Sequence, residues 1–164
     1  MEQKNIYSFS QIEDKVKALH ETNTEAAAAV ALSWLGLSRD ELKTLRISDY
    51  NSAMRMLHTA GRVVYVREDT IADMLKGICE KAPEYSMGFF ITDVNSAYEA
   101  AEKQGLSPIS VLKMRYFYEK HSAKLSGEPE DRVFLKEILR SIGESEADME
   151  KQFAEYENGA PEKI

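Results

Sequence analysis

Six basic residues lie between positions 39 and 67, and arginine and lysine are the side chains that most often bind phosphate groups. Three carboxylates stand in the same stretch, so its local charge is +3. Guanidinium and ammonium groups hold phosphate oxygens through charge-assisted hydrogen bonds. The stretch indicates either a surface that faces phosphates or a mixed solvated surface, and both interpretations stay open. The six residues are Arg39, Lys43, Arg46, Arg55, Arg62 and Arg67.

Metal and thiol chemistry have little support in the sequence. The three histidines, His20, His58 and His121, lie far apart, and none has a cysteine or carboxylate at the spacing of a zinc site. Cys79 is the single cysteine, so it cannot form an internal disulfide. We therefore expect no metal and no cofactor.

The composition favours one globular domain over residues 1–164, because 43% hydrophobic and 30% charged residues suit a single sizeable core. No apolar run has membrane-spanning length and no leader is evident, so we expect a cytoplasmic protein without membrane contact. Residues 128–164 hold 11 acidic and 5 basic side chains, which is most of the net charge of −7. The acidity is therefore mainly a C-terminal property.

Apolar residues recur at helical spacing along most of the chain, so we expect helices to position most of these side chains. We expect a first helix from Ser10, where Ser10 and Glu13 are spaced as a capping box, and a second from Thr24 that stops at Gly36. Ser38 begins a third helix with another capping-box pair. Later helices are expected to begin at Asp69, at Thr92, at Ser110, after Pro129 and near Ser145.

One strand pair interrupts the helices. Residues 54–57 and 63–66 are short β-favouring runs, and the sequence Thr-Ala-Gly-Arg at residues 59–62 between them predicts a hairpin that turns at Gly61. The expected fold is therefore mainly α with a small antiparallel β-hairpin or sheet, in the α+β class.

Residues 33–42 read Ser-Trp-Leu-Gly-Leu-Ser-Arg-Asp-Glu-Leu, and Leu45, Ser48 and Asp49 continue the pattern. This segment resembles the box TGLR..EL..L..SD of the tyrosine recombinases, the phage integrase family. The resemblance implies that Ser38 replaces an arginine that binds the scissile phosphate, and that Glu41 matches the acidic residue three positions later. Since Ser38 and Glu41 also form a capping box, a purely structural role is the alternative.

A second segment, residues 109–121, is similar to the ITPHxLRHTFATH helix of the same family. The resemblance implies that Leu112 replaces a catalytic histidine and that Arg115 matches the second phosphate-binding arginine. It assigns His121 to helix packing. In the hairpin, where the family has a catalytic lysine, the chain offers Arg62.

A third segment, residues 142–145, resembles the LGHS turn that precedes the nucleophilic tyrosine. Glu144 replaces the histidine or tryptophan of this turn, and Phe153 replaces the tyrosine nine residues later. A phenyl ring has no oxygen that could attack a phosphodiester, so we expect no enzyme. An active recombinase would have to use Tyr156, one helical turn beyond.

The resemblance covers about residues 8–157 and implies a tyrosine-recombinase catalytic-domain-like fold. We expect no arm or core-binding domain and a disordered tail over residues 158–164.

The leading hypothesis is an inactive recombinase-like domain that binds DNA or a recombination complex, as an accessory or regulatory protein in the integration of a mobile element. The competing hypothesis is a protein-interaction module that forms a homo- or hetero-oligomer through its acidic C-terminal helix. An acidic chain lacks a broad basic surface for DNA. The expected DNA contacts are Arg39, Lys43, Arg62, Lys113 and Arg115.

Overall fold

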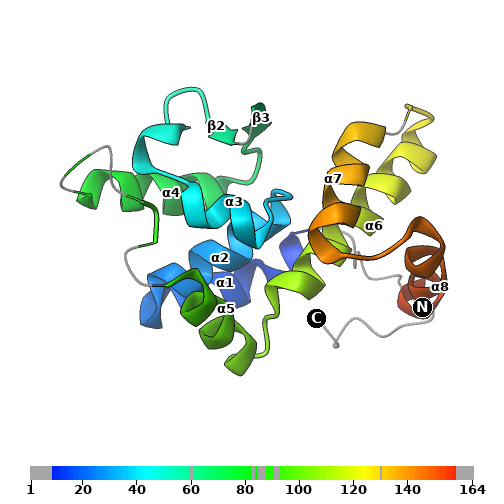
Figure 1. The fold of residues 1–164 in the computed structure, drawn as a ribbon, viewed down its shortest axis with the longest axis horizontal. Coiled ribbons are helices and arrows are strands. Elements are labelled where there is room, and N and C mark those ends of the chain that lie inside the picture. Colours follow the sequence, from blue (N-terminus) through cyan, green and yellow to red (C-terminus); the bar gives the residue numbers. More distant parts are fainter. Residues whose placement is uncertain are drawn as a thin grey trace.

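The computed structural model describes residues 9–59, 61–82, 84, 88–90, 93–129 and 131–157, without the side chains of residues 11, 124, 125 and 153–157. Within these ranges the chain is mainly helical with one small antiparallel sheet, which confirms the α+β class (Figure 1). The tail over residues 158–164 lies outside the described residues. The elements are α1 (Ser10–Thr22), α2 (Thr24–Trp34), α3 (Arg39–Thr44), the 3-10 helix η1 (Ile47–Asp49), β1 (Tyr50–Asn51), β2 (Met56–Thr59), β3 (Arg62–Tyr65), α4 (Asp69–Lys81), α5 (Val94–Lys103), α6 (Pro108–Ser126), α7 (Arg132–Ile142) and α8 (Glu146–Glu157).

The capping box predicted for the first helix is wrong. Helix α1 begins at Ser10, but Phe9 occupies its N-cap and no side chain caps it. The Glu13 carboxylate accepts a hydrogen bond from the Thr70 hydroxyl instead, which links α1 to α4. Glu13 thus binds a residue of another helix instead of the backbone at the start of its own helix.

In two further helices, the N-cap residue lies earlier in the sequence than predicted. Asn23, not Thr24, caps α2, and its side chain accepts a hydrogen bond from Ala26 N at 3.0 Å. Helix α6 begins at Pro108 and not at Ser110, because Ser107 caps it and proline fits the first helical position.

The N-caps of α4 and α5 each differ by one residue from the predicted Asp69 and Thr92. Glu68 stands at the N-cap of α4 without a side-chain cap bond, and Asp69 is already helical and pairs with Arg55. Asp93 caps α5, while Thr92 lies outside the described residues.

Helix α2 forms the centre of the main core. Its residues 26–34 are all buried, and the helix packs against α1, α4, α5 and α6. Small alanine side chains let these neighbours approach closely on every face. The buried hydroxyl of Ser33 donates to Ala29 O at 2.7 Å, so this buried polar side chain has a partner within the helix.

The sheet has three strands in the order β1–β2–β3, so the predicted hairpin is confirmed and a short third strand is added. Thr59 pairs with Arg62, and Leu57 with Val64. Gly61 takes φ +75° in the connection, as the predicted turn requires. Leu57 and Val64 face the core, and the opposite face of the hairpin is exposed.

Helix α6 joins two hydrophobic cores. Val111 and Met114 belong to the main core with α1 to α5 and the sheet, while Leu112, Tyr116 and Phe117 belong to a second core with α7 and α8. In Figure 1, α7 and α8 accordingly stand beside the larger body and α6 runs between the two.

Candidate functional site

Several residues that the family resemblance singles out contact the turn between α2 and α3. The Arg62 side chain, from β3, donates through Nη2 to Gly36 O at 3.2 Å. The Arg115 side chain, from α6, donates through Nη1 to Trp34 O at 3.0 Å. Two arginines far apart in sequence therefore bind carbonyls of the same short segment.

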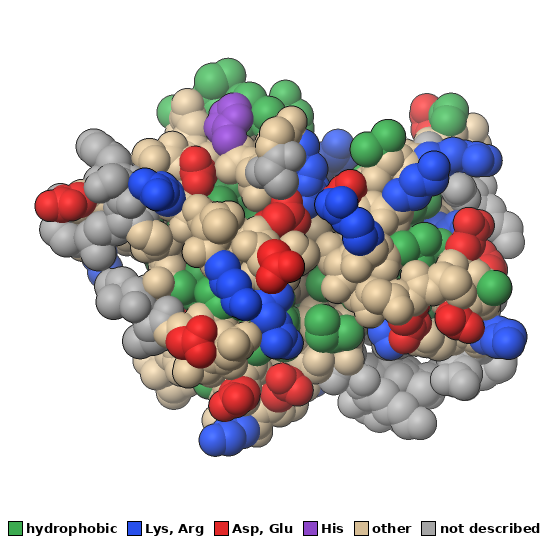
Figure 2. All heavy atoms as spheres, viewed as in Figure 1, with side chains coloured by type: hydrophobic (Ala, Val, Ile, Leu, Met, Phe, Trp, Pro, Cys, Tyr) green, Lys and Arg blue, Asp and Glu red, His purple; other side chains and the backbone are tan. Residues whose placement is uncertain are grey.

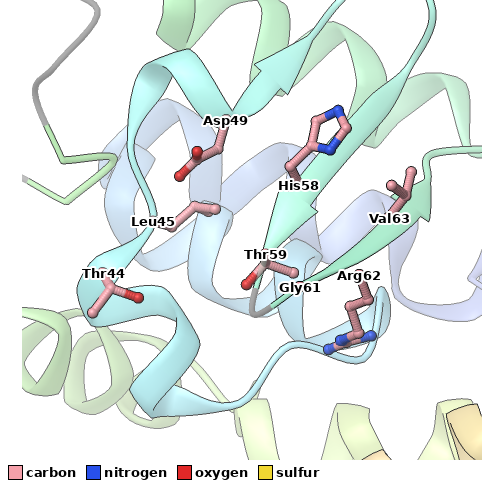
Figure 3. Close-up of a pocket in the computed structure, with 8 residues that line it drawn as sticks. All are labelled: Thr44, Leu45, Asp49, His58, Thr59, Gly61, Arg62 and Val63. Carbon is pink, nitrogen blue, oxygen red and sulfur yellow. The ribbon is translucent and has the colours of Figure 1, made fainter.

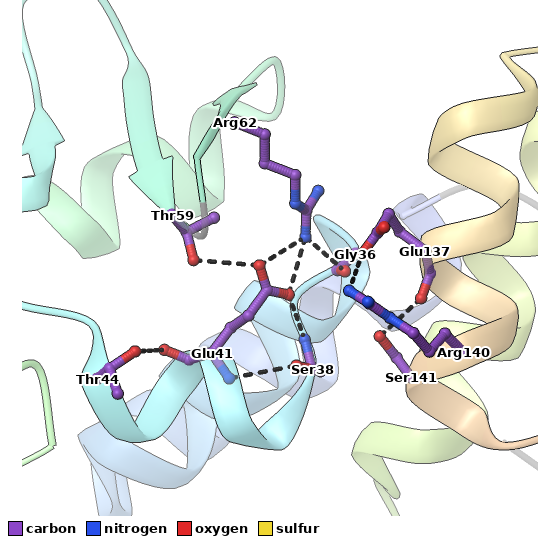
Figure 4. A network of polar contacts seen from close by, with 9 residues as sticks. All are labelled: Gly36, Ser38, Glu41, Thr44, Thr59, Arg62, Glu137, Arg140 and Ser141. Atoms are coloured by element: carbon purple, nitrogen blue, oxygen red, sulfur yellow. Dashed lines mark hydrogen bonds and ion pairs between the residues drawn. The ribbon is translucent and has the colours of Figure 1, made fainter.

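Glu41 is the centre of the polar network at this turn (Figure 4). The Ser38 side chain accepts from Glu41 N at 3.2 Å, and Glu41 Oε1 accepts from Ser38 N at 3.0 Å, which confirms the predicted capping box. Arg62 Nη2 lies 2.8 Å from Oε1 and 3.0 Å from Oε2, and Thr59 donates to Oε2 at 3.1 Å. The carboxylate is fully occupied in holding the hairpin to α3.

Arg115 lies in an aromatic cage. Its guanidinium lies over the rings of Trp34, Tyr118 and Phe134, with centroid distances of 5.3, 5.7 and 4.9 Å. Its Nη2 also lies 2.6 Å from Glu119 Oε1, one turn later on α6. Only 14% of this side chain is exposed, so its charge is neutralised and covered.

The remaining cations expected to bind DNA are also partnered. Lys113 Nζ lies 3.1 Å from Glu144 Oε1, so two residues of different boxes form an ion pair between α6 and the turn before α8. Arg39 lies over the Tyr98 ring at 4.4 Å and donates to Asn95. Lys43 approaches Asp40 at 3.9 Å, which is a weak exposed contact.

Leu112, which the sequence resemblance aligns with a histidine, is fully buried in the second core. The Glu144 carboxylate accepts a hydrogen bond from the Gln152 side chain and also forms the ion pair with Lys113. Phe153 and Tyr156 belong to α8, but their side chains lie outside the described residues.

A hollow of about 540 Å³ opens beside the hairpin, between α3, η1 and β2 (Figure 3). Arg62 and Asp49 are the charged residues in its lining. Arg62 is engaged by Glu41, and Asp49 accepts from Arg46 N at 2.8 Å. Both charged side chains of the lining are therefore engaged within the protein, and His58 is the further titratable residue that lines the hollow.

Two of the six basic side chains of the 39–67 stretch stand apart from the others. Arg46 and Arg67 are exposed, and no carboxylate among the described residues forms an ion pair with either side chain. The sequence alone did not separate these two from the four that have partners. The i,i+4 spacing of Arg115 and Glu119 and the i,i+3 spacing of Asp40 and Lys43 are partner signals that the sequence carries.

Comparison with known proteins adds no relative: no family model, curated protein or solved structure matches the chain. Among the described residues, no group of three His, Cys, Asp or Glu side chains is placed to hold a metal ion. None of the helices in the described ranges combines the length and apolar character needed to cross a membrane.

Proposed function

We propose that this chain is a catalytically inactive domain of the tyrosine-recombinase kind, which acts by protein contact as an accessory or regulatory member of a recombination complex. The observation that carries the proposal is the neutralisation of Arg62 by Glu41 and of Arg115 by Glu119. A phosphate clamp needs cations that are free to meet the phosphate, and these two are engaged within the protein.

The convergence of the matched positions supports the recombinase resemblance. Ser38, Glu41, Arg62 and Arg115 come from three separate segments and all meet the turn at residues 34–38. A chance similarity of short motifs gives no reason for such a meeting. Under this proposal the matched positions stay grouped around one turn, while their charges serve to hold elements together.

DNA contact is a second candidate function, and exposed Arg46 and Arg67 favour it. Their charges are available to phosphates, whereas the net charge of the chain is −7. Two free arginines would give weak, non-specific binding with a shallow dependence on salt.

Two measurements on the purified chain test the proposal. A nicked suicide duplex is incubated with the chain and analysed by mass spectrometry for a covalent adduct. Labelled duplex DNA is titrated across a salt series and followed by fluorescence anisotropy. We expect no adduct and no saturable binding at physiological salt.

A matched variant makes the DNA measurement sharper. Glu119→Gln keeps the shape of the side chain but releases the charge of Arg115, so it should bind duplex DNA more tightly than the unchanged chain. An adduct at any tyrosine would overturn the inactive assignment. Weak binding at low salt that Arg67→Ala abolishes would favour DNA contact over protein contact.

A further inference from the structure

Strand β3 forms one edge of the sheet, and the hydrogen bonds show which of its backbone groups face outward. Val66 N donates to Arg55 O at 2.9 Å, and Val64 and Arg62 continue the same pairing register with β2. Backbone groups of an antiparallel strand point alternately to its two sides. The N–H and C=O groups of Val63 and Tyr65 therefore point away from β2, toward an edge with which no strand of the described ranges pairs.

The side chains of this edge alternate between the core and solvent. Val64 and Val66 are buried, whereas Val63 is 42% and Tyr65 is 61% exposed. His58 lies opposite Val63 on the exposed face. Figure 2 shows hydrophobic side chains gathered over the region where Figure 1 places β2 and β3, next to a histidine.

Natural proteins usually protect such an edge with charged side chains, proline or a covering segment. Residues 62–67 contain no proline, and Arg62, the charge at the start of the strand, turns inward to Glu41. The outward row instead reads Val63, Tyr65 and then Arg67. The exposed residues of this edge would therefore allow another β-strand to pair with β3.

The charge at the end of the row identifies the partner's chemistry. Arg67 continues the exposed row and has no ion-pair partner among the described residues, since nearby Asp69 is paired with Arg55 at 2.9 Å. A carboxylate on an added strand would complement Arg67, and apolar side chains would cover Val63 and Tyr65. Strand β3 itself contains no carboxylate, so β3 of a second copy of the chain could not supply the acidic residue opposite Arg67.

We propose that the free edge of β3 binds an extended segment of another protein as a fourth strand, in which apolar residues alternate and an acidic residue lies opposite Arg67. This inference rests on the proposed function, because it assigns the surface of the protein contact. Main-chain hydrogen bonds would give the affinity, and the Val63–Tyr65–Arg67 row would give the specificity.

The test begins with selection of short random peptides, displayed on phage, against the full chain. Val63→Pro serves for counter-selection because proline removes an outward N–H and leaves the bonds of Arg62 and Val64 to β2 in place. We expect the enriched peptides to alternate apolar residues and to carry an acidic residue near one end.

The best selected peptide is then synthesised with a fluorescent label for anisotropy. A version with N-methyl groups on alternate amides cannot complete a strand ladder, so it should lose at least about tenfold in affinity. Arg67→Glu should weaken the acidic peptide and strengthen one in which lysine replaces the acidic residue. Circular dichroism confirms that both variants remain folded.

Several results would overturn the proposal. These are peptides enriched equally on Val63→Pro, an N-methylated peptide that binds as well as its parent, or an unchanged charge preference in Arg67→Glu. Concentration-dependent dimerisation that Val63→Pro abolishes would make a second copy the occupant. If the peptides fail while DNA binding and adducts remain absent, the surface assignment falls and the proposed function stands.

Discussion

Arg62 Nη2 lies 2.8 Å from one carboxylate oxygen of Glu41 and 3.0 Å from the other, and this contact fastens the hairpin to the first turns of α3. The side chains are 21% and 10% exposed, so the pair is mostly removed from water. A site that the sequence resemblance associates with phosphate binding is thus closed by an internal carboxylate.

Removing that carboxylate should destabilise the fold. Glu41→Ala leaves Arg62 without its ion pair and removes the partner of Ser38 N and Thr59, so we expect a loss of about 2 to 4 kcal/mol in the free energy of unfolding. Urea denaturation followed by circular dichroism measures it. Asp40→Ala, at a 94% exposed position on the same helix, is the control and should cost less than about 0.5 kcal/mol. Equal losses in the two variants would contradict this account.

Lysine should not replace Arg115. A single ammonium cannot keep the contacts to Glu119 and Trp34 O while covering the aromatic rings, so Arg115→Lys should cost about 1 to 3 kcal/mol. Trp34 is the one tryptophan of the chain, so its fluorescence reports directly on this cage. Arg140→Lys, at an exposed position on α7, should leave both stability and emission unchanged. Unaltered emission in Arg115→Lys would argue against the cage.

Gly36 is sensitive for two separate reasons. Its φ is +95°, and an added Cβ would lie 2.6 Å from the Phe134 ring. Gly36→Ala should therefore cost about 3 kcal/mol, whereas Gly143→Ala, at φ +70° with open space around it, should cost about 1 kcal/mol. Thermal denaturation compares them. If the double variant Gly36→Ala with Phe134→Leu recovers nothing, the close approach is not the cause.

Alkaline solutions should weaken the fold partly through Tyr98. Burial raises the pKa of its phenol above the ordinary value of 10.0, and Ser33 and Arg39 act in the opposite direction. A raised pKa means that the unfolded chain loses this proton first. The contribution is complete below the ordinary pKa and is lost as the pH rises through the raised one.

The variant Tyr98→Phe tests this dependence. Between about pH 9 and about pH 11 it should lose less stability than the unchanged chain. Near neutral pH the two should differ little, because the buried Tyr98 hydroxyl makes no hydrogen bond of good geometry with the described residues, although Ser33 and Arg39 lie near enough to lower its pKa. Denaturant titrations at each pH provide the comparison, and parallel pH profiles would exclude Tyr98 as a contributor.

Local signals account for the features that the sequence predicted. The capping box of Ser38 and Glu41 lies within one turn, and the hairpin depends on two β-favouring runs around Gly61, so both were readable. Strand β1 has two residues, Tyr50 and Asn51, which is too short for a periodic pattern. It exists because β2 offers it a pairing edge.

Tertiary contacts explain what the sequence did not reveal. Thr70 draws Glu13 away from the expected capping box, and Glu144 pairs with Lys113 across 31 positions of sequence. The i,i+4 pair of Arg115 and Glu119 was readable, but the cage of three rings around it was not. Residue types alone therefore overstated the number of cations free to meet DNA.

Helix α2 has a consequence for how this chain can vary over evolutionary time. A helix at a surface has an outer face on which substitutions are silent, but residues 26–34 have none. Larger side chains would collide with the surrounding helices, and polar ones would lack partners. Divergence should therefore collect in other segments, and a run of small residues ending in a buried tryptophan should be the signature by which distant descendants of this chain are recognised.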